Sequence, residues 1–489
     1  MSASDTAKSG RSSAGEAGVP AGALLVVLMA VVSTVAVLAW PARTAPGRTM
    51  WTSARLHYQL YEPIVAEWNQ TREPRVNMTL MSLEALERRL LSGFLSGTGC
   101  ADLLETERRV AARAFTGPLE SVGFVDLTDR LKSEGLYEQI NAASFSPWTS
   151  RGRIFGLPHD VHPVMLGYRA DLVEAAGIDV SQIETWDDFV RLMLPLMAER
   201  DGDGKPKRYI LNLWETQGET IEALILQAGG TFFDEQGRPT LASARNAATI
   251  AQIVAWTNGP NRIAAEARDF SASGNRLKLE GYVIASVMPD WMCNIWKNEI
   301  PQLKGKVKLM PMPAWEKGGR RTSVWGGTML GISKTAPDFE ELWAFAKNLY
   351  LSPEMARALY REGDIVTPVK SLWNDPIYDE PDAYFSGQAK GRMYIDLAPS
   401  VPLRASSPYN SIAILAVQDA VVALGIYARQ SGKFTVAELE PEALAALAPA
   451  QKRLEQLLDR NVFLRESAAN DGGTGLSRLA GATEAGVTK

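Results

Sequence analysis

One segment near the N-terminus limits the possible folds of this chain more than any other. Ala21 to Trp40 forms a run of 20 residues without a charged side chain. A helix of this length, rising about 1.5 Å per residue, can cross a hydrocarbon core of roughly 30 Å. The segment therefore predicts either a retained transmembrane anchor or a secretory signal peptide. Residues 1–20, which precede the apolar segment, are predicted to form a flexible tail.

Sequence signals favour the retained anchor, but they do not exclude a signal peptide. The apolar run exceeds the usual signal-peptide core of about 7–15 residues. Residues 37–39 offer a small-residue cleavage site, but the bulky Trp40 follows it directly. Basic residues flank the segment on both sides, so their distribution does not fix its orientation in a membrane. Under either interpretation, most of the chain is expected outside the cytoplasm.

The remaining composition is that of a soluble protein with a large packed core. The chain has 489 residues, a formal net charge of -5 and a hydrophobic fraction of 46%. This length predicts two to four domain-sized units, at about 100–200 residues for each. The mild acidity gives no basic surface for nucleic acid. The two cysteines, Cys100 and Cys293, exclude a disulfide scaffold and a cysteine-rich metal site, and they can be paired or free.

Strand and helix signals alternate along the chain, which predicts an α/β architecture. Arg75 to Met81 alternates apolar and polar residues like a half-buried strand, and Ser82 can cap the helix that follows. Thr185 with Asp188 predicts a capping box that opens a helix over residues 186–199. A last long helix is expected over residues 441–459.

Two other segments have simpler interpretations than their composition first suggests. Residues 466–489 contain few large apolar side chains and predict a disordered tail. The acidic, glycine-rich segment from Asp201 to Lys205 lacks the later oxygen ligands of a calcium-binding EF-hand loop, since Lys205 and Asn212 occupy those positions. A turn between a helix and a strand is therefore expected there.

Several short motifs occur in one order along the chain. They are Trp51-Thr52, Leu95-Ser-Gly-Thr-Gly-Cys-Ala-Asp102, Gly156-Leu-Pro158, Leu166-Gly-Tyr168-Arg-Ala-Asp171, Glu184-Thr-Trp-Asp-Asp188, Pro289-Asp-Trp291, Val307-Lys-Leu-Met-Pro311, Trp325-Gly-Gly-Thr-Met-Leu-Gly-Ile-Ser-Lys334 and Tyr350-Leu-Ser-Pro-Glu354. In this ordered set the chain resembles the family 1 extracellular solute-binding proteins, the maltose-binding-like receptors of ABC importers. The resemblance covers about residues 48–463.

The resemblance implies a two-lobed periplasmic-binding-protein-like fold of type II, the Venus flytrap, in which hinge strands join two α/β lobes. Carried onto this chain, it places lobe one at 49–160 and 314–335, and lobe two at 165–309 and 336–465. The hinge crossings are then expected near 160–164, 309–314 and 334–337. The ligand would lie between the lobes, and hinge closure would enclose it.

Aromatic residues at matching positions are the first candidates for ligand contact. A sugar has apolar C–H faces and hydroxyl edges, which suit an indole ring beside polar groups. The resemblance implies such a role for one group of residues, although each aromatic could instead pack in a core. The group comprises Trp51, Trp214 with Glu215, Trp291, Trp325 with Gly326 and Gly327, and Tyr409.

Polar candidates follow a predicted strand and the first hinge crossing. Glu105 and Glu107 would share one face of an extended segment, where they could bind hydroxyl groups or remain solvated surface charges. Asp160 and His162 lie at the crossing. No metal site is predicted, because His159 and His162 fall on opposite faces of a strand and the third histidine is distant in sequence. No cofactor is expected.

The resemblance therefore implies a monomeric receptor rather than an enzyme. Such a receptor would bind a carbohydrate, an oligosaccharide or glycoside, and deliver it to the membrane subunits of an ABC permease. The absence of a GxxxxGK[ST] motif assigns ATP hydrolysis to a separate subunit. Within related families, glycerol phosphate derivatives and polyamines are alternative ligands.

Two other classes of function remain. A membrane-anchored sugar sensor fits the apolar segment, if that segment is retained. An extracytoplasmic glycosidase would need two carboxyl groups about 5–5.5 Å or 6.5–9.5 Å apart, a distance that sequence cannot supply. The chain has no GxSxG or HExxH motif, so two common hydrolase signatures are missing.

Overall fold

A computed structural model describes residues 21–39 and 47–464. The predicted tails, 1–20 and 466–489, lie outside the described residues, as does Trp40 at the end of the apolar segment. The chain divides into two units, residues 1–47 and 48–489. In the first unit, helix α1 (Ala21–Ala39) covers nearly all of the predicted apolar segment.

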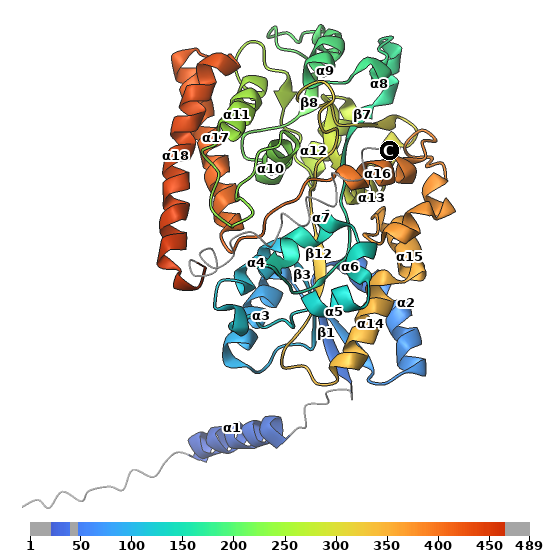
Figure 1. Cartoon of the computed structure of the whole chain (residues 1–489), viewed down its shortest axis with the longest axis vertical. Coiled ribbons are helices and arrows are strands. Elements are labelled where there is room, and N and C mark those ends of the chain that lie inside the picture. The colour runs from blue at the N-terminus through green and yellow to red at the C-terminus, as the bar shows by residue number, and fades with distance from the viewer. Residues whose placement is uncertain (1–20, 40–46, 465–489) are drawn as a thin grey trace, which may run out of the picture. The chain divides into compact units, whose positions relative to one another are not determined.

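The second unit is two-lobed, and each lobe is built on one mixed sheet (Figure 1). In the first lobe the strand order is β2-β1-β3-β12-β6, with β1, β2 and β3 parallel and β12 antiparallel to both of its neighbours. These strands are β1 (Arg48–Thr52), β2 (Val76–Leu80), β3 (Leu103–Glu107), β6 (Leu157–Pro158) and β12 (Thr328–Ile332). A short hairpin of β4 (Thr149–Ser150) and β5 (Arg153–Ile154) comes just before β6 in the sequence.

The second lobe has the strand order β11-β7-β10-β8-β9. Strand β7 is antiparallel to β10 and β11, whereas β8, β9 and β10 are parallel. The strands are β7 (Val164–Arg169), β8 (Tyr209–Asn212), β9 (Ala264–Ala265), β10 (Val283–Pro289) and β11 (Val307–Pro311). Every residue of β7 and β10 is buried, as expected for inner strands covered by helices on both faces.

Helices cover both sheets and complete the apolar cores, which form two clusters in the first lobe and one large cluster in the second. Those of the first lobe are α2 (Arg55–Thr71), α3 (Leu83–Ser96), α4 (Arg108–Ala114), α5 (Thr128–Ser133), α6 (Leu136–Gln139), α7 (Ala142–Phe145), α14 (Phe339–Leu351) and α15 (Pro353–Gly363). Those of the second lobe are α8 (Ala170–Ala175), α9 (Trp186–Met193), α10 (Gly218–Gln227), α11 (Ala244–Thr257), α12 (Ala272–Glu280), α13 (Asp290–Glu299), α16 (Lys390–Leu397), α17 (Asn410–Ser431) and α18 (Val436–Arg460).

The local start signals place helices as expected, but two lengths differ from the predictions. The Ser82 hydroxyl accepts a hydrogen bond from the amide of Ala85, and both bonds of the Thr185–Asp188 capping box are present. Helix α9 ends at Met193, short of the predicted residue 199, because a 3₁₀ turn containing Pro195 follows. Helix α18 begins at Val436, before the predicted residue 441, because a second capping box at Thr435 starts it earlier.

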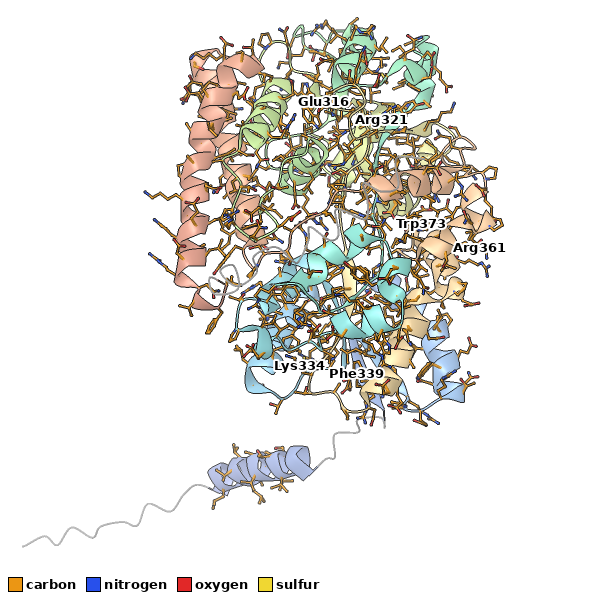
Figure 2. The ribbon with its side chains drawn as sticks, viewed as in Figure 1. Glu316, Arg321, Lys334, Phe339, Arg361 and Trp373 are labelled. Carbon is orange, nitrogen blue, oxygen red and sulfur yellow. The ribbon has the colours of Figure 1, made fainter. Side chains whose placement is uncertain are left out.

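The second crossing between the lobes lies later in the chain than expected. The Ala314 amide donates to the Glu184 carbonyl over 2.8 Å, and the Thr322 hydroxyl donates to the Val164 carbonyl over 2.9 Å. Residues 312–323 therefore belong to the second lobe, and the chain reaches β12 only through residues 324–327. Figure 2 shows Arg321 among the elements of the second lobe, whereas Lys334 lies at the far end of the first.

The third crossing is also displaced, because α14 and α15 stay on the first lobe. Leu342 and Trp343 are buried in the core that contains Met50, and Figure 2 shows Phe339, the first residue of α14, beside Lys334. The amphipathic faces of these helices thus complete the first lobe, contrary to the predicted assignment of 336–465 to lobe two. The chain returns to the second lobe through residues 364–369, where the Pro368 carbonyl accepts from the Asn141 amide.

Among the described residues, α17 is the one helix long and apolar enough, by length and composition, to cross a membrane. It packs against α10, α11 and α18 in the second lobe. Val417, Val421 and Leu424 are buried in that core. We interpret α17 as a core helix, which satisfies the same criterion of length and composition.

Candidate functional site

Trp291 lies where the two lobes meet, on the first turn of α13 directly after β10 ends. Its half-buried ring packs against the apolar cores of both lobes. The indole N–H donates to the Trp325 carbonyl over 2.9 Å, and the two rings meet edge to face at 5.7 Å. On another side, Phe270 is parallel to the Trp291 ring, with 6.2 Å between the ring centroids.

Gly326 and Gly327 bring the backbone close to this tryptophan pair. Their φ angles are +117° and +125°, values that L-residues with a side chain rarely adopt. A Cβ atom on Gly326 would lie 2.6 Å from His162 Cδ2 and 3.0 Å from Trp291 Nε1. We call Trp291, Trp325, Gly326, Gly327 and His162 the junction. The predicted glycines are thus required by close packing between hinge segments.

His162 connects the first hinge crossing to the second lobe. Its Nε2 lies 3.0 Å from the Asp160 carboxylate and its Nδ1 lies 2.7 Å from the Asp290 carboxylate. The other oxygen of Asp290 accepts from the Val366 amide over 2.9 Å, so the third crossing joins the same group. Burial disfavours the charged imidazole, but Asp160 and Asp290 outweigh it and raise the pKa of His162 to about 10. The buried imidazolium holds two crossings together.

Glu105 lies inside the first lobe rather than on a ligand-facing surface. Its carboxylate accepts from the hydroxyl groups of Tyr61 and Tyr350 over 2.6 and 3.0 Å, and also from Thr52. His57 Nδ1 lies 2.8 Å away. Burial opposes ionisation, but His57 outweighs it and lowers the pKa of Glu105 to about 2. The buried Glu105 carboxylate therefore holds together the segments that surround it in the first lobe.

The third histidine is distant only in sequence. The rings of His57 and His159 are 4.3 Å apart, and ligand atoms of His57, Glu105 and His159 lie within 4.8 Å of one another. The distance of His57 from His159 in sequence therefore does not exclude a metal site, because the fold brings the two rings together. We assign no metal, because protein donors already occupy both oxygens of the Glu105 carboxylate.

A buried ion pair joins the lobes beside the junction. The Arg108 guanidinium on α4 donates to both oxygens of Glu222 on α10, over 2.9 and 2.5 Å. Two parallel hydrogen bonds of this kind fix orientation as well as distance. The predicted Glu107, one residue earlier, is exposed at the end of β3.

Trp214 and Glu215 line a separate cavity of about 770 Å³ on the second lobe. It extends along β8 and β9 and includes Arg262 and Arg429. Glu215 accepts from Arg429 over 2.8 Å, and Arg262 lies over the ring of Tyr209. The cavity does not include the junction residues, so the predicted tryptophans occupy two different places.

The last two predicted aromatics have packing roles. Trp51 is buried on β1, with the Arg89 guanidinium 5.9 Å from its ring centroid. The Tyr409 hydroxyl donates to the Leu457 carbonyl over 3.3 Å and so ties α17 to α18. Of the predicted residues, the structure therefore brings together Trp291, Trp325, Gly326, Gly327, Asp160 and His162.

Sequence reasoning missed several residues at the junction. Phe270, Glu219 and Arg404 come from three distant segments, and none lies in a motif that indicates its role. Glu219 accepts from the Trp325 indole N–H over 2.6 Å, and Arg404 donates to the Gly326 carbonyl. These contacts exist only because the fold brings the segments together.

Comparison with known proteins agrees with this architecture. The family model for bacterial extracellular solute-binding proteins matches residues 53–356, which is more than half of the chain. The chain belongs to this family. Its members are solute-binding receptors, not enzymes.

Individual relatives of this solute-binding protein are distant. An arabinooligosaccharide-binding protein of Halalkalibacterium halodurans is 26% identical over 352 residues, covering 68% of this chain and 74% of the relative. A protein of the same description from Bacillus subtilis is 26% identical and covers 61% of this chain and 68% of the relative. The structure of the sugar-binding protein MalE of Xanthomonas citri has a TM-score of 0.66 at 15% identity, over 85% of this chain and 99% of that one. This last similarity establishes the two-lobed fold.

Proposed function

We propose that this solute-binding protein is the carbohydrate-binding subunit of an ABC importer. The observation that carries the proposal is Trp291, whose ring contacts the cores of both lobes at their junction. An indole ring offers a flat apolar face to the C–H groups of a sugar. The two curated relatives are described as arabinooligosaccharide-binding proteins, which supports an oligosaccharide as the ligand.

The binding step is a reversible closure without a covalent reaction. A ligand that contacts both lobes stabilises the closed arrangement by its difference in affinity between the two states. Trp291, Trp325 and the Gly326–Gly327 backbone supply the contacts on the hinge side. The His162–Asp290 pair keeps two crossings in register while the lobes move.

A thermal-shift screen of the purified protein tests the proposal. Arabinotriose, maltotriose and galactobiose would be compared with spermidine and glycerol 3-phosphate. A sugar at about 100 times its dissociation constant should add roughly 2.7 kcal/mol to the free energy of unfolding. Stabilisation by spermidine or glycerol 3-phosphate, with no response to any sugar, would contradict the carbohydrate assignment.

The partner is proposed to be a membrane permease with a separate ATPase subunit. Membership of the extracellular solute-binding family supports this partner and a location outside the cytoplasm. Pull-down of the full chain from membranes, with its ligand present, should recover the permease subunits. Recovery of a signalling receptor in their place would favour a sugar sensor.

The apolar helix α1 supports a second proposal, membrane attachment by residues 21–40. N-terminal sequencing of the mature protein checks it. An intact N-terminus would support the anchor, and a new N-terminus after residue 39 would support a cleaved signal peptide.

A further inference from the structure

Two short segments of the second lobe each carry unpaired buried polar atoms. Five side-chain atoms there have no hydrogen-bond partner among the residues that the structure describes. They are Gln217 Oε1, Thr220 Oγ1, Arg404 Nε, Ser406 Oγ and Asn410 Nδ2. An unpaired buried donor or acceptor costs about 1–3 kcal/mol, so folded proteins rarely retain several close together.

These two segments lie side by side and adjoin the junction. A Cβ atom on Gly218 would lie 2.9 Å from Ile414 Cγ2, so the start of α10 packs on the first turns of α17. In the same turn of α10, Glu219 accepts from the Trp325 indole N–H. The segments that carry the unpaired atoms therefore pack next to Trp325, and the atoms themselves are buried. We call Gln217, Thr220, Arg404, Ser406 and Asn410 the polar strip.

Arg404 links the strip to both the first lobe and the hinge. Its amide donates to the Ser146 hydroxyl over 3.1 Å, and its guanidinium donates to the Gly326 carbonyl. The side chain is 5% exposed and forms no ion pair with a carboxylate of residues 47–464. Burial, and then the nearby Arg108, lower the pKa of Arg404 to about 9. A buried guanidinium with an unpaired N–H is a costly arrangement without a further hydrogen-bond acceptor.

The donors and acceptors of the strip match hydroxyl groups. The strip offers the N–H groups of Arg404 and Asn410, the carbonyl oxygen of Gln217, and two hydroxyl groups. Each hydroxyl of a sugar can donate and accept at once, so one sugar unit can satisfy such a mixed set. A polyamine has no acceptor for Arg404 and would be repelled by its charge.

The charges around the strip favour a neutral ligand. Glu222 pairs with Arg108, and the carboxylates of Glu222 and Glu219 both act favourably on the Arg404 charge. Carboxylates thus already act on the guanidinium at short range, so it does not require an anionic ligand. A carboxylate on the ligand would instead face Glu219 and Glu222.

We infer that the polar strip binds the hydroxyl groups of one neutral sugar unit, with Arg404 as the specificity-determining residue. This inference rests on the proposed carbohydrate function and names the residues and the ligand class that carry it. Trp291 and Trp325 contact the sugar faces, and the strip binds the hydroxyl edge.

Three variants of the full chain test the inference by calorimetric titration with arabinotriose, maltotriose and galactobiose. Arg404→Met should weaken the affinity for the sugar that binds by at least tenfold. Ser406→Ala and Thr220→Val should each weaken it by about three- to tenfold, since each removes one hydrogen-bonding group. Arg392→Met is the matched control, because Arg392 pairs with Asp379 on the surface of the same lobe, and it should bind like the wild type.

Stability separates a binding role from a structural role. Ser406→Ala and Thr220→Val delete hydroxyl groups that have no hydrogen-bond partner within residues 47–464, so their thermal unfolding midpoints should equal or exceed that of the wild type. Loss of stability with unchanged affinity would overturn the inference. The same two variants also keep the test decisive if Arg404→Met does not fold.

The remaining outcomes distinguish the inference from the proposed function. If the wild type binds a sugar and all three variants retain its dissociation constant, the strip assignment is wrong and the proposed function stands. If trigalacturonate binds more tightly than every neutral sugar, the neutral class is wrong. If the wild type binds none of the sugars, the proposed function fails and the strip assignment fails with it.

Discussion

Trp291 is a single side chain that contacts both lobes. Its ring packs on both cores, and its N–H fixes the backbone at Trp325. Trp214 has neither kind of contact and lines a separate cavity. The two tryptophans therefore distinguish between two possible places for the ligand.

The first prediction compares these two tryptophans. Trp291→Ala should weaken sugar affinity by more than tenfold, which corresponds to about 1.4 kcal/mol, because an aromatic contact in both lobes is lost. Trp214→Ala should change the affinity much less. Calorimetry on both variants checks this, and the opposite order would place the ligand in the cavity along β8 and β9.

The second prediction concerns His162 and pH. The pKa of His162 is about 10 in the folded protein and near its ordinary value of 6.5 in the unfolded chain. A raised folded pKa means that this stabilisation is complete below pH 6.5 and is lost as the pH rises towards 10. The contribution of one proton to the slope is at most about 1.4 kcal/mol per pH unit.

His162→Asn removes the titrating group and suits the site, since His162 has a φ of +54° and asparagine tolerates that region. The variant should be less stable than the wild type at pH 7, and the difference should shrink as the pH approaches 10. Urea unfolding between pH 6.5 and 10 measures it. A pH-independent difference would contradict a charged His162.

At the scale of elements, a buried ion pair joins α4 of one lobe to α10 of the other. Arg108 and Glu222 are both nearly inaccessible to solvent. Removing one partner leaves the other charge buried without compensation, whereas removing both does not. The Arg108–Glu222 pair is therefore expected to couple the two lobes energetically.

The third prediction is a double-mutant cycle on this pair. Arg108→Met should lower the free energy of unfolding by roughly 3 kcal/mol, and Arg108→Met with Glu222→Met should recover much of that loss. Urea unfolding of the wild type, both single variants and the double variant gives the coupling energy. Additive losses would mean that the two side chains do not interact in solution.

At the scale of the whole molecule, residues 48–464 contain both sheets and both lobe cores. The apolar helix α1 belongs to a different unit of the chain. The proposed ligand binding and the proposed membrane attachment thus fall on separate segments. We expect hinge closure to need residues 48–464 alone.

The fourth prediction follows from this division. A fragment of residues 48–464 should fold cooperatively and bind the sugar found in the screen within twofold of the affinity of the full chain. Circular dichroism and calorimetry check the two parts. A folded fragment with tenfold weaker binding would show that residues outside 48–464 contribute to the site.

Much of the local structure could be predicted from neighbouring residues. The capping box at Thr185 and the apolar repeat after Ser82 place their helices, because these interactions span only a few residues. The motif order identified the two-lobed α/β fold. The lobe boundaries were wrong at two crossings, because the faces on which α14 and α15 pack depend on contacts with distant segments.

The sequence alone determined the apolar N-terminal segment and the alternation of strands and helices, and it predicted a ligand-binding role for Trp291 and the Gly326–Gly327 pair that stays a prediction. Tertiary structure alone decided that Glu105 is buried, that three histidines lie near two crossings, and that Arg404 donates to the Gly326 carbonyl at the junction. The physical reason is the separation along the chain over which each interaction acts. Helix caps and apolar periodicity act between neighbours, whereas burial and the pairing of charges depend on which distant segments pack together.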